Sequence, residues 1–333
     1  MRGTGPVAYG AIVAMLSLLA TVTPPVAGTT SAEVLTDERT SLSVSGGTLH
    51  GSLLVPPGSA PVPIALLISG SGPTDRDGNT PLLPGKNDSL KLLAEGLAAR
   101  NLASLRYDKR GIGESVGAGR NESRLRFENY IDDAAAWGQR LRKDKRFSSL
   151  VIVGHSQGSL IGVVAAQKIP ADAFVSLEGV GQPAPDLMLA QLRPKLSPNT
   201  MAAVEGLVAK LKAGQTGMVP TGLEALFRPS VQPYLISWFK YDPAREVSKL
   251  RMPVLIMQGT TDMQTGPADA TRLGSVNPKA RVVILDGMNH VLKRVPLDEE
   301  RQVASYSDPS LPVEPRLIQE IADFVLSLGR AVQ

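Results

Sequence analysis

The chain has 333 residues, of which 43% are hydrophobic and 20% charged, and it contains no cysteine. This length can bury a sizeable core, and the absence of cysteine excludes a disulfide framework, a thiol nucleophile and cysteine-based metal sites. The formal net charge is only +4. The densest basic cluster falls at the end of a predicted helix, where cations suit the helix dipole, so we expect no nucleic-acid partner.

Residues 1–28 have the pattern of an export signal. An apolar stretch over residues 7–22 is followed by Pro24-Pro25 and by the small residues VAG at 26–28. We expect a signal peptide that is cleaved after Gly28, and a secreted or periplasmic protein with no stable membrane partner. A retained membrane anchor is the alternative, because about 16 apolar residues approach spanning length. Residues 29–40 are polar and predict a flexible lead-in.

Apolar patterns predict an alternation of strands and helices in the next part of the chain. Residues 41–56 alternate around Gly46-Gly47 and predict a β-hairpin, and residues 62–69 form a continuous apolar run typical of a strand buried on both faces. Further strands are predicted over 102–107, 150–153 and 173–177, and helices over 87–100, 128–143 and 157–167. This order favours a mostly parallel sheet with helices on both faces.

Residues 183–245 interrupt this alternation. They contain helix-like patterns and several prolines, and no convincing strand. We expect a helical lid insertion over the C-terminal edge of the sheet, where open α/β sheets bind ligands. An ordinary helical subdomain without a binding role is the alternative. After it, strands are predicted over 253–257 and 281–285, and helices over 267–275 and 315–328.

A serine stands between two glycines where a predicted strand gives way to a helix. The sequence at 154–158 is GHSQG, with Ser156 at its centre. This spacing is typical of a nucleophile on a tight, strained turn, because side chains at the two flanking positions would collide with neighbouring backbone. A glycine-rich loop with an incidental serine is the alternative, and the strand-to-helix context favours the nucleophile.

A serine nucleophile needs a base, and the chain has only three histidines. His50 falls in the predicted hairpin, where a surface or packing role is expected. His155 adjoins the serine on a turn that points neighbouring side chains apart, so we expect it to pack beneath the turn. His290, in the loop after the last predicted strand, is the candidate base. Asp262 follows the preceding strand and is the candidate acid, and Asp286, in the same loop as His290, is its competitor.

Two backbone amides are candidates for stabilising an oxyanion. The Gln157 amide stands at the start of a predicted helix, where the helix dipole adds positive potential. The second donor should come from GSGP at residues 70–73, where glycines let the backbone approach a substrate closely. Ser71 is the candidate there, and Gly72 is the near alternative. No metal-ligand cluster is visible, and the chemistry needs no cofactor.

Five motifs between residues 69 and 293 carry a family resemblance. They are SGSGPTDRDGN (69–79), LRYDKRGIGES (105–115), VGHSQG (153–158), LIMQGTTD (255–262) and GMNHVLK (287–293). With them the chain resembles the α/β-hydrolase superfamily, and more narrowly the secreted bacterial carboxylesterases near the serine-aminopeptidase-like (S33-type) hydrolases. The resemblance implies an α/β-hydrolase fold over residues 41–330 with the helical lid insertion.

By this resemblance, Ser156, Asp262 and His290 match the family's catalytic triad, and the amides of Ser71 and Gln157 match its oxyanion hole. The resemblance also implies that four polar loop residues shape the rim of the site: Arg76, Asp77, Asp108 and Arg110. Many relatives carry Leu or Met after the serine. Gln157 therefore makes the floor of the expected pocket more polar.

The function that these residues predict is hydrolysis of a small-molecule carboxylic ester, with short acyl chains favoured. The alternatives are a serine peptidase or amidase, a thioesterase, and a secreted binding protein that keeps the fold without the chemistry. An aminopeptidase would need a carboxylate to hold the amino group of its substrate, and acids are sparse in the insertion. Aromatic residues in or beside the insertion either line an acyl pocket or pack its helices: Phe227, Tyr234, Trp238, Phe239 and Tyr241.

Overall fold

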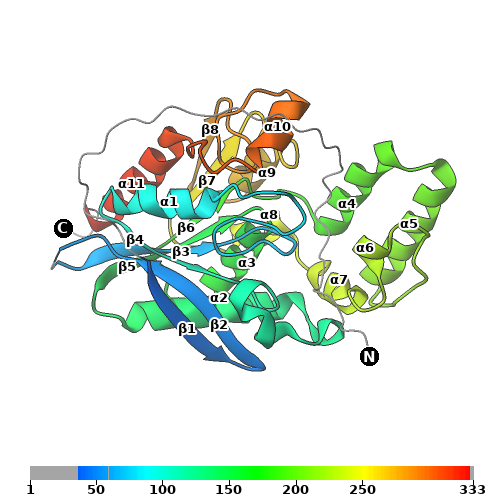
Figure 1. The fold of residues 1–333 in the computed structure, drawn as a ribbon, viewed down its shortest axis with the longest axis horizontal. Coiled ribbons are helices and arrows are strands. Elements are labelled where there is room, and N and C mark those ends of the chain that lie inside the picture. The colour runs from blue at the N-terminus through cyan, green and yellow to red at the C-terminus, as the bar shows by residue number, and fades with distance from the viewer. Residues whose placement is uncertain (1–36, 59, 331–333) are drawn as a thin grey trace.

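The computed structural model describes residues 37–58 and 60–330, and these form one eight-stranded sheet with helices on both faces (Figure 1). The expected signal peptide (1–28) lies outside the described residues. The strands are β1 (Glu38–Val44), β2 (Gly47–Leu54), β3 (Val62–Ile68), β4 (Ala103–Tyr107), β5 (Phe147–His155), β6 (Ala173–Leu177), β7 (Val254–Gly259) and β8 (Ala280–Leu285).

Helices follow most of these strands. The α-helices are α1 (Ser89–Ala98), α2 (Phe127–Lys143), α3 (Gln157–Ala166), α4 (Ala184–Leu192), α5 (Pro198–Lys212), α6 (Glu224–Phe227), α7 (Gln232–Trp238), α8 (Pro243–Ser248), α9 (Pro267–Ser275), α10 (Glu299–Ser305) and α11 (Pro315–Arg330). The 3₁₀ helices are η1 (Gly113–Gly119), η2 (Glu122–Arg124) and η3 (Arg193–Lys195). Within the described ranges, no helix is both long and apolar enough to cross a membrane.

The strand order across the sheet is β1-β2-β4-β3-β5-β6-β7-β8. The strands from β4 to β8 all pair in parallel, and only the β1–β2 and β2–β4 pairs are antiparallel. The expected mostly parallel sheet is therefore confirmed. The expected lead-in over 29–40 is wrong at its end, because Glu38, Arg39 and Thr40 already pair with β2.

Alternate side chains of the central strands enter two separate apolar cores. In β3, Ile64, Leu66 and Ile68 pack with residues of α2 and α3, whereas Ala65 and Leu67 pack with residues of α1 and α11. Successive side chains of a strand point to opposite faces, so a strand covered on both faces must be apolar throughout. This accounts for the continuous apolar run at residues 62–69.

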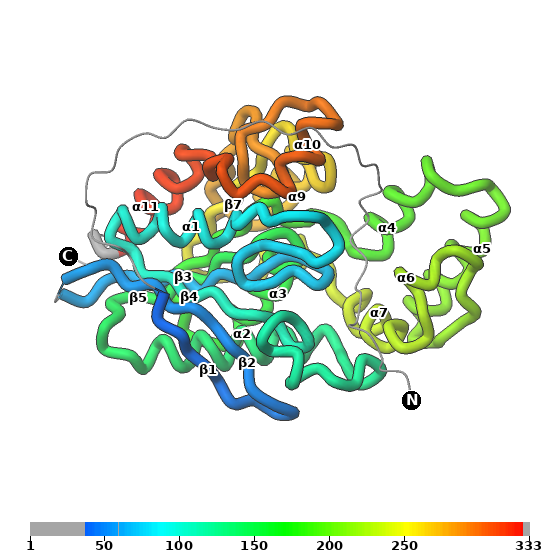
Figure 2. Tube along the Cα trace, viewed as in Figure 1, coloured from blue at the N-terminus to red at the C-terminus, as the bar shows by residue number. Residues whose placement is uncertain are grey.

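The chain between β6 and β7 is helical throughout its regular elements, from α4 to α8. These elements cover the lid insertion expected over 183–245, and α8 ends slightly beyond it, at Ser248. Figure 2 shows α4 to α7 gathered beside the body of the sheet. The insertion is tied to that body, because the hydroxyl of Ser237 accepts a hydrogen bond of 2.7 Å from the Phe127 amide at the start of α2.

Candidate active site

Ser156 occupies a sharp turn between β5 and α3. Its backbone angles are φ 53° and ψ −122°, a left-handed conformation that side chains rarely adopt. A Cβ at Gly154 would collide with the carbonyl group of Gly158, and a Cβ at Gly158 would collide with the carbonyl oxygen of Ile68 in β3. The two glycines therefore let α3 start directly against the sheet, with Ser156 held in a strained geometry.

Asp262 and His290 meet at the same edge of the sheet. Asp262 follows β7 and His290 follows β8, and His290 Nδ1 donates a hydrogen bond of 2.7 Å to Asp262 Oδ2. The other carboxylate oxygen, Oδ1, accepts the amides of Gln264 and Thr265 at 2.6 and 3.1 Å. The Thr265 hydroxyl donates to Oδ2 at 2.8 Å. These donors fix the orientation of the carboxylate and, through it, of the imidazole ring.

The pKa of Asp262 reflects the same contacts. Burial raises the pKa of this carboxyl group, but the charge and hydrogen bond of His290, together with the other donors, hold it well below its usual range. Asp262 is thus ionised at neutral pH. A carboxylate beside a histidine Nδ1 is the arrangement that favours imidazolium formation during proton transfer.

The competing residues lie elsewhere. The side chain of Asp286 is 88% exposed, and its carboxylate contacts Thr260 and Arg294 instead of His290. His155 is buried beneath the turn, as expected, and its Nε2 donates to the His290 carbonyl oxygen at 2.7 Å. Burial lowers the pKa of His155 to about 3, so its ring is neutral. His50 lies in β2.

The Ser156 hydroxyl has no hydrogen-bond partner among the described residues. The structure thus joins Asp262 to His290 and leaves the serine hydroxyl unengaged. Hydrogen bonds between a nucleophile and its base commonly tighten only when a substrate binds.

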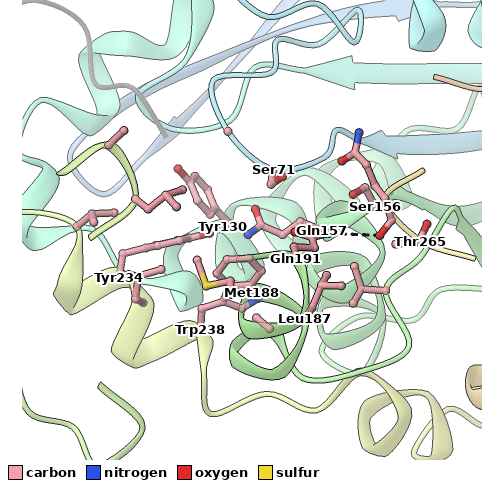
Figure 3. Close-up of a pocket in the computed structure, with 18 of the residues that line it drawn as sticks. Ser71, Tyr130, Ser156, Gln157, Leu187, Met188, Gln191, Tyr234, Trp238 and Thr265 are labelled. Carbon is pink, nitrogen blue, oxygen red and sulfur yellow. Dashed lines mark hydrogen bonds between the residues drawn. The ribbon is translucent and has the colours of Figure 1, made fainter. Parts of the chain in front are cut away.

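Ser156 opens onto a cavity of about 110 Å³ whose wall includes Ser71, Gly72 and Gln157 (Figure 3). The amides of these three residues have no acceptor within the described part of the chain. The Gln157 amide is the first of α3, where an N–H has no partner inside the helix. The two expected donors, Ser71 and Gln157, thus line the same cavity as Ser156, and so does the alternative, Gly72.

The lid insertion supplies the far wall of the cavity. Leu187, Met188 and Gln191 line it from α4, and Tyr234 and Trp238 line it from α7 (Figure 3). The Gln191 side chain donates to the Gln264 carbonyl oxygen at 3.3 Å, which links the insertion to the loop that carries Asp262.

The aromatic cluster of the insertion divides between the two expected roles. Tyr234 and Trp238 line the cavity. Phe227 is completely buried in the core, and Phe239 and Tyr241 pack against that core. Trp238 also stacks on Phe127 of α2, with ring centroids 6.0 Å apart.

Comparison with known proteins agrees with this geometry. The family model of the serine aminopeptidases, S33, matches residues 85–212. Esterase EstD from Thermotoga maritima is 28% identical over 259 residues, which cover 77% of this chain and 60% of EstD. Est1E from Butyrivibrio proteoclasticus, solved with ferulic acid bound, has a TM-score of 0.57 at 17% identity and covers 87% of this chain and 98% of that one.

A puromycin-hydrolysing peptidase from Mycobacterium tuberculosis has the same fold, with a TM-score of 0.55 at 18% identity over 88% of this chain and 39% of that one. Ser156, Asp262 and His290 follow β5, β7 and β8 in the chain order known for the triads of this fold. The chain has the α/β-hydrolase fold. It spans about 60% of the length of EstD.

The four polar loop residues are not among those that line the cavity, and the rim role expected for them stays a prediction. Arg76 pairs with Asp108 at 2.8 Å, and Arg110 pairs with Asp133 of α2 at 2.6 Å. Asp77 accepts a hydrogen bond from Arg106 at 3.0 Å. These pairs connect the loops after β3 and β4 to each other, to β4 and to α2.

Two buried charged residues of the chain were not predicted as site residues. Lys109 lines the cavity, and its Nζ donates to Ser69 Oγ at 2.8 Å and to the Gly70 carbonyl oxygen at 2.5 Å, just before Ser71. Glu178 shares the Gln258 side-chain amide with Asp262 as a hydrogen-bond donor. Lys109 falls within the motif LRYDKRGIGES, but nothing in the sequence alone marks it as buried. Glu178 falls in no motif.

The side chains of the described ranges were also compared with the ligand groups that bind metal ions. No group of three or more His, Asp or Glu side chains there is placed to hold a metal ion.

Proposed function

We propose that this α/β-hydrolase is a serine hydrolase of carboxylic esters. The observation that carries the proposal is the 2.7 Å hydrogen bond from His290 to a buried Asp262, with the His290 ring packed 4.9 Å from the ring of His155, the residue before Ser156 on the strained turn. The esterase names of EstD and Est1E support the same reaction class.

In the proposed reaction, Ser156 attacks the ester carbonyl carbon while His290 takes the hydroxyl proton. Asp262 stabilises the imidazolium, and the amides of Ser71 and Gln157 donate to the oxyanion of the tetrahedral intermediate. The intermediate collapses as the C–O bond breaks, and His290 returns the proton to the leaving alcohol. A water molecule, deprotonated by His290, then hydrolyses the acyl-enzyme at Ser156.

The cavity favours an ester over an aminopeptidase substrate. Its lining within the described chain contains no Asp or Glu, so nothing there would neutralise the ammonium group of a free amino terminus. Lys109 lines the same cavity and would repel that group when protonated. Asp186, an acid of the insertion, pairs with Lys212 at 3.7 Å and does not line the cavity.

Short acyl chains are the proposed substrates. A cavity of about 110 Å³ is small beside ligand pockets of several hundred Å³, and aromatic rings from α7 close its far wall. The acyl group would lie against Trp238 and Met188, and the Gln157 side chain adds a polar group at the serine end.

The test is hydrolysis of p-nitrophenyl esters from acetate to dodecanoate beside an aminoacyl p-nitroanilide. We expect the highest kcat/KM for short acyl esters, and a loss on the order of 10⁴-fold to 10⁶-fold in Ser156→Ala. Ser123→Ala, which changes an exposed serine, is the matched control. A higher kcat/KM for the anilide would favour the peptidase, and full activity in Ser156→Ala would exclude Ser156 as the nucleophile.

A further inference from the structure

Glu178 is a buried acid that the proposed reaction leaves without a role. It follows β6 directly, at the same edge of the sheet as Ser156 and Asp262, and it has no exposed surface. Its φ of 47° is the left-handed conformation that side chains rarely adopt, so the surrounding structure must hold it there. The Glu178 amide donates to the Met257 carbonyl oxygen at 3.0 Å, which fixes the residue between β6 and β7.

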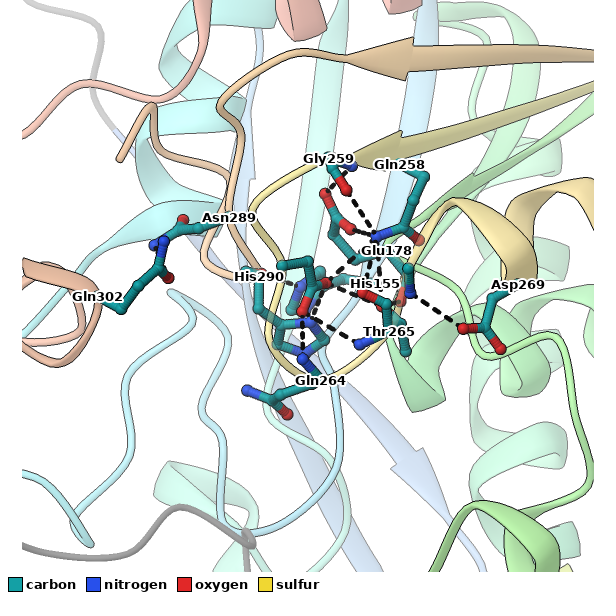
Figure 4. A network of polar contacts seen from close by, with 12 residues as sticks. His155, Glu178, Gln258, Gly259, Gln264, Thr265, Asp269, Asn289, His290 and Gln302 are labelled. Carbon is teal, nitrogen blue, oxygen red and sulfur yellow. Dashed lines mark hydrogen bonds and ion pairs between the residues drawn. The ribbon is translucent and has the colours of Figure 1, made fainter. Parts of the chain in front are cut away.

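The Glu178 side chain belongs to a polar network around Asp262 (Figure 4). The Gly259 amide donates to Glu178 Oε1 at 2.9 Å, and the Gln258 side-chain amide donates to Oε2. The same Gln258 nitrogen lies 3.4 Å from Asp262 Oδ2. The Thr265 hydroxyl joins the network as well, at 2.8 Å from Asp262 Oδ2 and 3.3 Å from the Glu178 carbonyl oxygen.

The carboxyl groups of Glu178 and Asp262 are both buried, and they share the Gln258 side-chain amide as a hydrogen-bond donor. Two ionised carboxylates so placed repel each other, and a proton on one of the two groups relieves this repulsion. Asp262 already accepts from His290, from two amides and from a hydroxyl, and all of these favour its ionised form. The proton therefore belongs to Glu178. Consistently, burial and the charge of Asp262 raise the pKa of Glu178 well above its usual value.

We propose that Glu178 is a positioning residue whose protonated carboxyl group donates a hydrogen bond to Asp262 and keeps the Asp262 carboxylate turned toward His290. The proposal rests on the proposed function, because the orientation of Asp262 matters only if His290 acts as a base.

A neutral donor suits this position better than a second anion. An ionised Glu178 would place two negative charges together in a site closed to water, which is costly. A second negative charge would also raise the pKa of the His290 imidazolium, so that the ring would return its proton to the leaving alcohol less readily. The other titratable groups around the pair are His155, which is neutral, and Tyr306, whose pKa burial raises. Neither supplies a positive charge that would balance a second carboxylate.

The two variants that separate a donor from a charge are Glu178→Gln and Glu178→Met. Glutamine is neutral, can donate to Asp262 and can still accept from the Gly259 amide. The Gln258 amide can turn to meet it, because Gln258 Oε1 has no partner in the described structure. Methionine has a similar length and no donor. We expect Glu178→Gln to keep most of kcat, and Glu178→Met to lose about 10-fold to 100-fold in kcat with little change in KM.

The pH profile of kcat/KM distinguishes a neutral Glu178 from a charged one, and a purely structural role of Glu178 would not affect it. Its acidic limb reports the pKa of the base in the free enzyme. We expect Glu178→Gln to leave this limb in place, because a neutral donor replaces a neutral donor. A shift of the limb to lower pH would mean that a negative charge had been removed and would overturn the proposal. An equal loss of kcat in the two variants, with both proteins folded by circular dichroism, would overturn it too.

Infrared difference spectra of the wild type and Glu178→Gln test the proton itself. At neutral pH we expect the wild type to show the carbonyl stretching band of a protonated carboxylic acid, and Glu178→Gln to lack it. Absence of this band in the wild type would overturn the proposal. The spectra need no substrate, so this result remains distinct from a failure of the proposed esterase activity in the wild-type protein.

Discussion

At the scale of single residues, Lys109 connects the end of β4 to the loop after β3 that lines the cavity. It is almost completely buried, and it donates to Ser69 and Gly70 in the loop that presents the Ser71 amide. Burial lowers the pKa of Lys109 to about 7, against the opposing charges of Asp108 and Asp75. A lysine in the unfolded chain titrates near 10.4. Between these two pKa values, the unfolded chain therefore binds the Lys109 proton while the folded protein does not.

This difference predicts how stability changes with pH. Between about pH 7 and pH 10, the unfolded chain keeps the Lys109 proton while the folded protein has released it, so stability from this residue rises with pH. Relative to Lys109→Met, we expect the unfolding free energy of the wild type to increase by on the order of 1 kcal/mol or more over this range. Urea unfolding at several pH values measures it.

The matched control for that series is Lys168→Met, because Lys168 pairs with Asp132 at the surface. The control should follow the wild type across the whole range. If Lys109→Met also stays parallel to the wild type, the lysine titrates at its ordinary pKa in the folded protein and the pH argument is wrong.

At the scale of elements, α7 sets the size of the cavity. Trp238 lines it, whereas the neighbouring Phe239 packs against the core. We expect Trp238→Ala to lengthen the cavity and raise the kcat/KM ratio of octanoate to acetate esters by about 10-fold or more. Phe239→Ala removes a ring from the same helical insertion without opening the cavity, and it should leave the ratio near the wild-type value. Equal ratios in both variants would argue against an acyl site at α7.

The elements also show which features a single sequence can predict. The apolar run of β3 and the amphipathic pattern of α2 follow from local spacing, so their positions are close to those expected. The start of β1 does not follow from local spacing. Glu38 to Thr40 are polar, and they form a strand because β2 offers hydrogen-bonding partners, which is a property of the neighbouring strand.

The same contrast holds for the candidate site. Ser156, Asp262 and His290 could be predicted because each follows a recognisable strand and the chain has few histidines. Glu178 could not, since a glutamate after a strand usually faces solvent. Its carboxyl group is buried against Gln258 and Gly259, which lie far along the chain. The ion pairs of Arg76 with Asp108 and of Arg110 with Asp133 could not be predicted either, because each joins residues from different parts of the chain.

At the scale of the whole molecule, the parallel strands bring distant residues to one edge. The loops after β3, β5, β6, β7 and β8 contribute Ser71, Ser156, Glu178, Asp262 and His290. This edge requires the backbone of α3 to touch that of β3, and Gly158 permits the contact. Stability of the frame and geometry of the site therefore depend on the same position.

Substitution of two glycines tests this dependence. Gly158→Ala should lower the unfolding free energy by about 2 kcal/mol or more, because its methyl group would meet the Ile68 carbonyl oxygen. Gly206 lies inside α5 with nothing within 4 Å of its Cβ position. Gly206→Ala should raise the unfolding free energy by about 0.5–1 kcal/mol. Urea midpoints compare the two, and equal effects would show that the close approach at Gly158 is unimportant.

The helical insertion connects β6 to β7, two strands that pair with each other in parallel. The segment leaves β6 after Leu177 and re-enters the sheet at Val254, which lies opposite Phe174, so the β6–β7 pairing fixes the separation of its two ends whatever its length. The entropy of closing such a segment grows slowly with the number of residues in it. We therefore expect the sheet to tolerate insertions and deletions between β6 and β7. Such changes would alter the wall of the cavity, and with it the substrate, while Ser156, Asp262 and His290 keep their places after other strands.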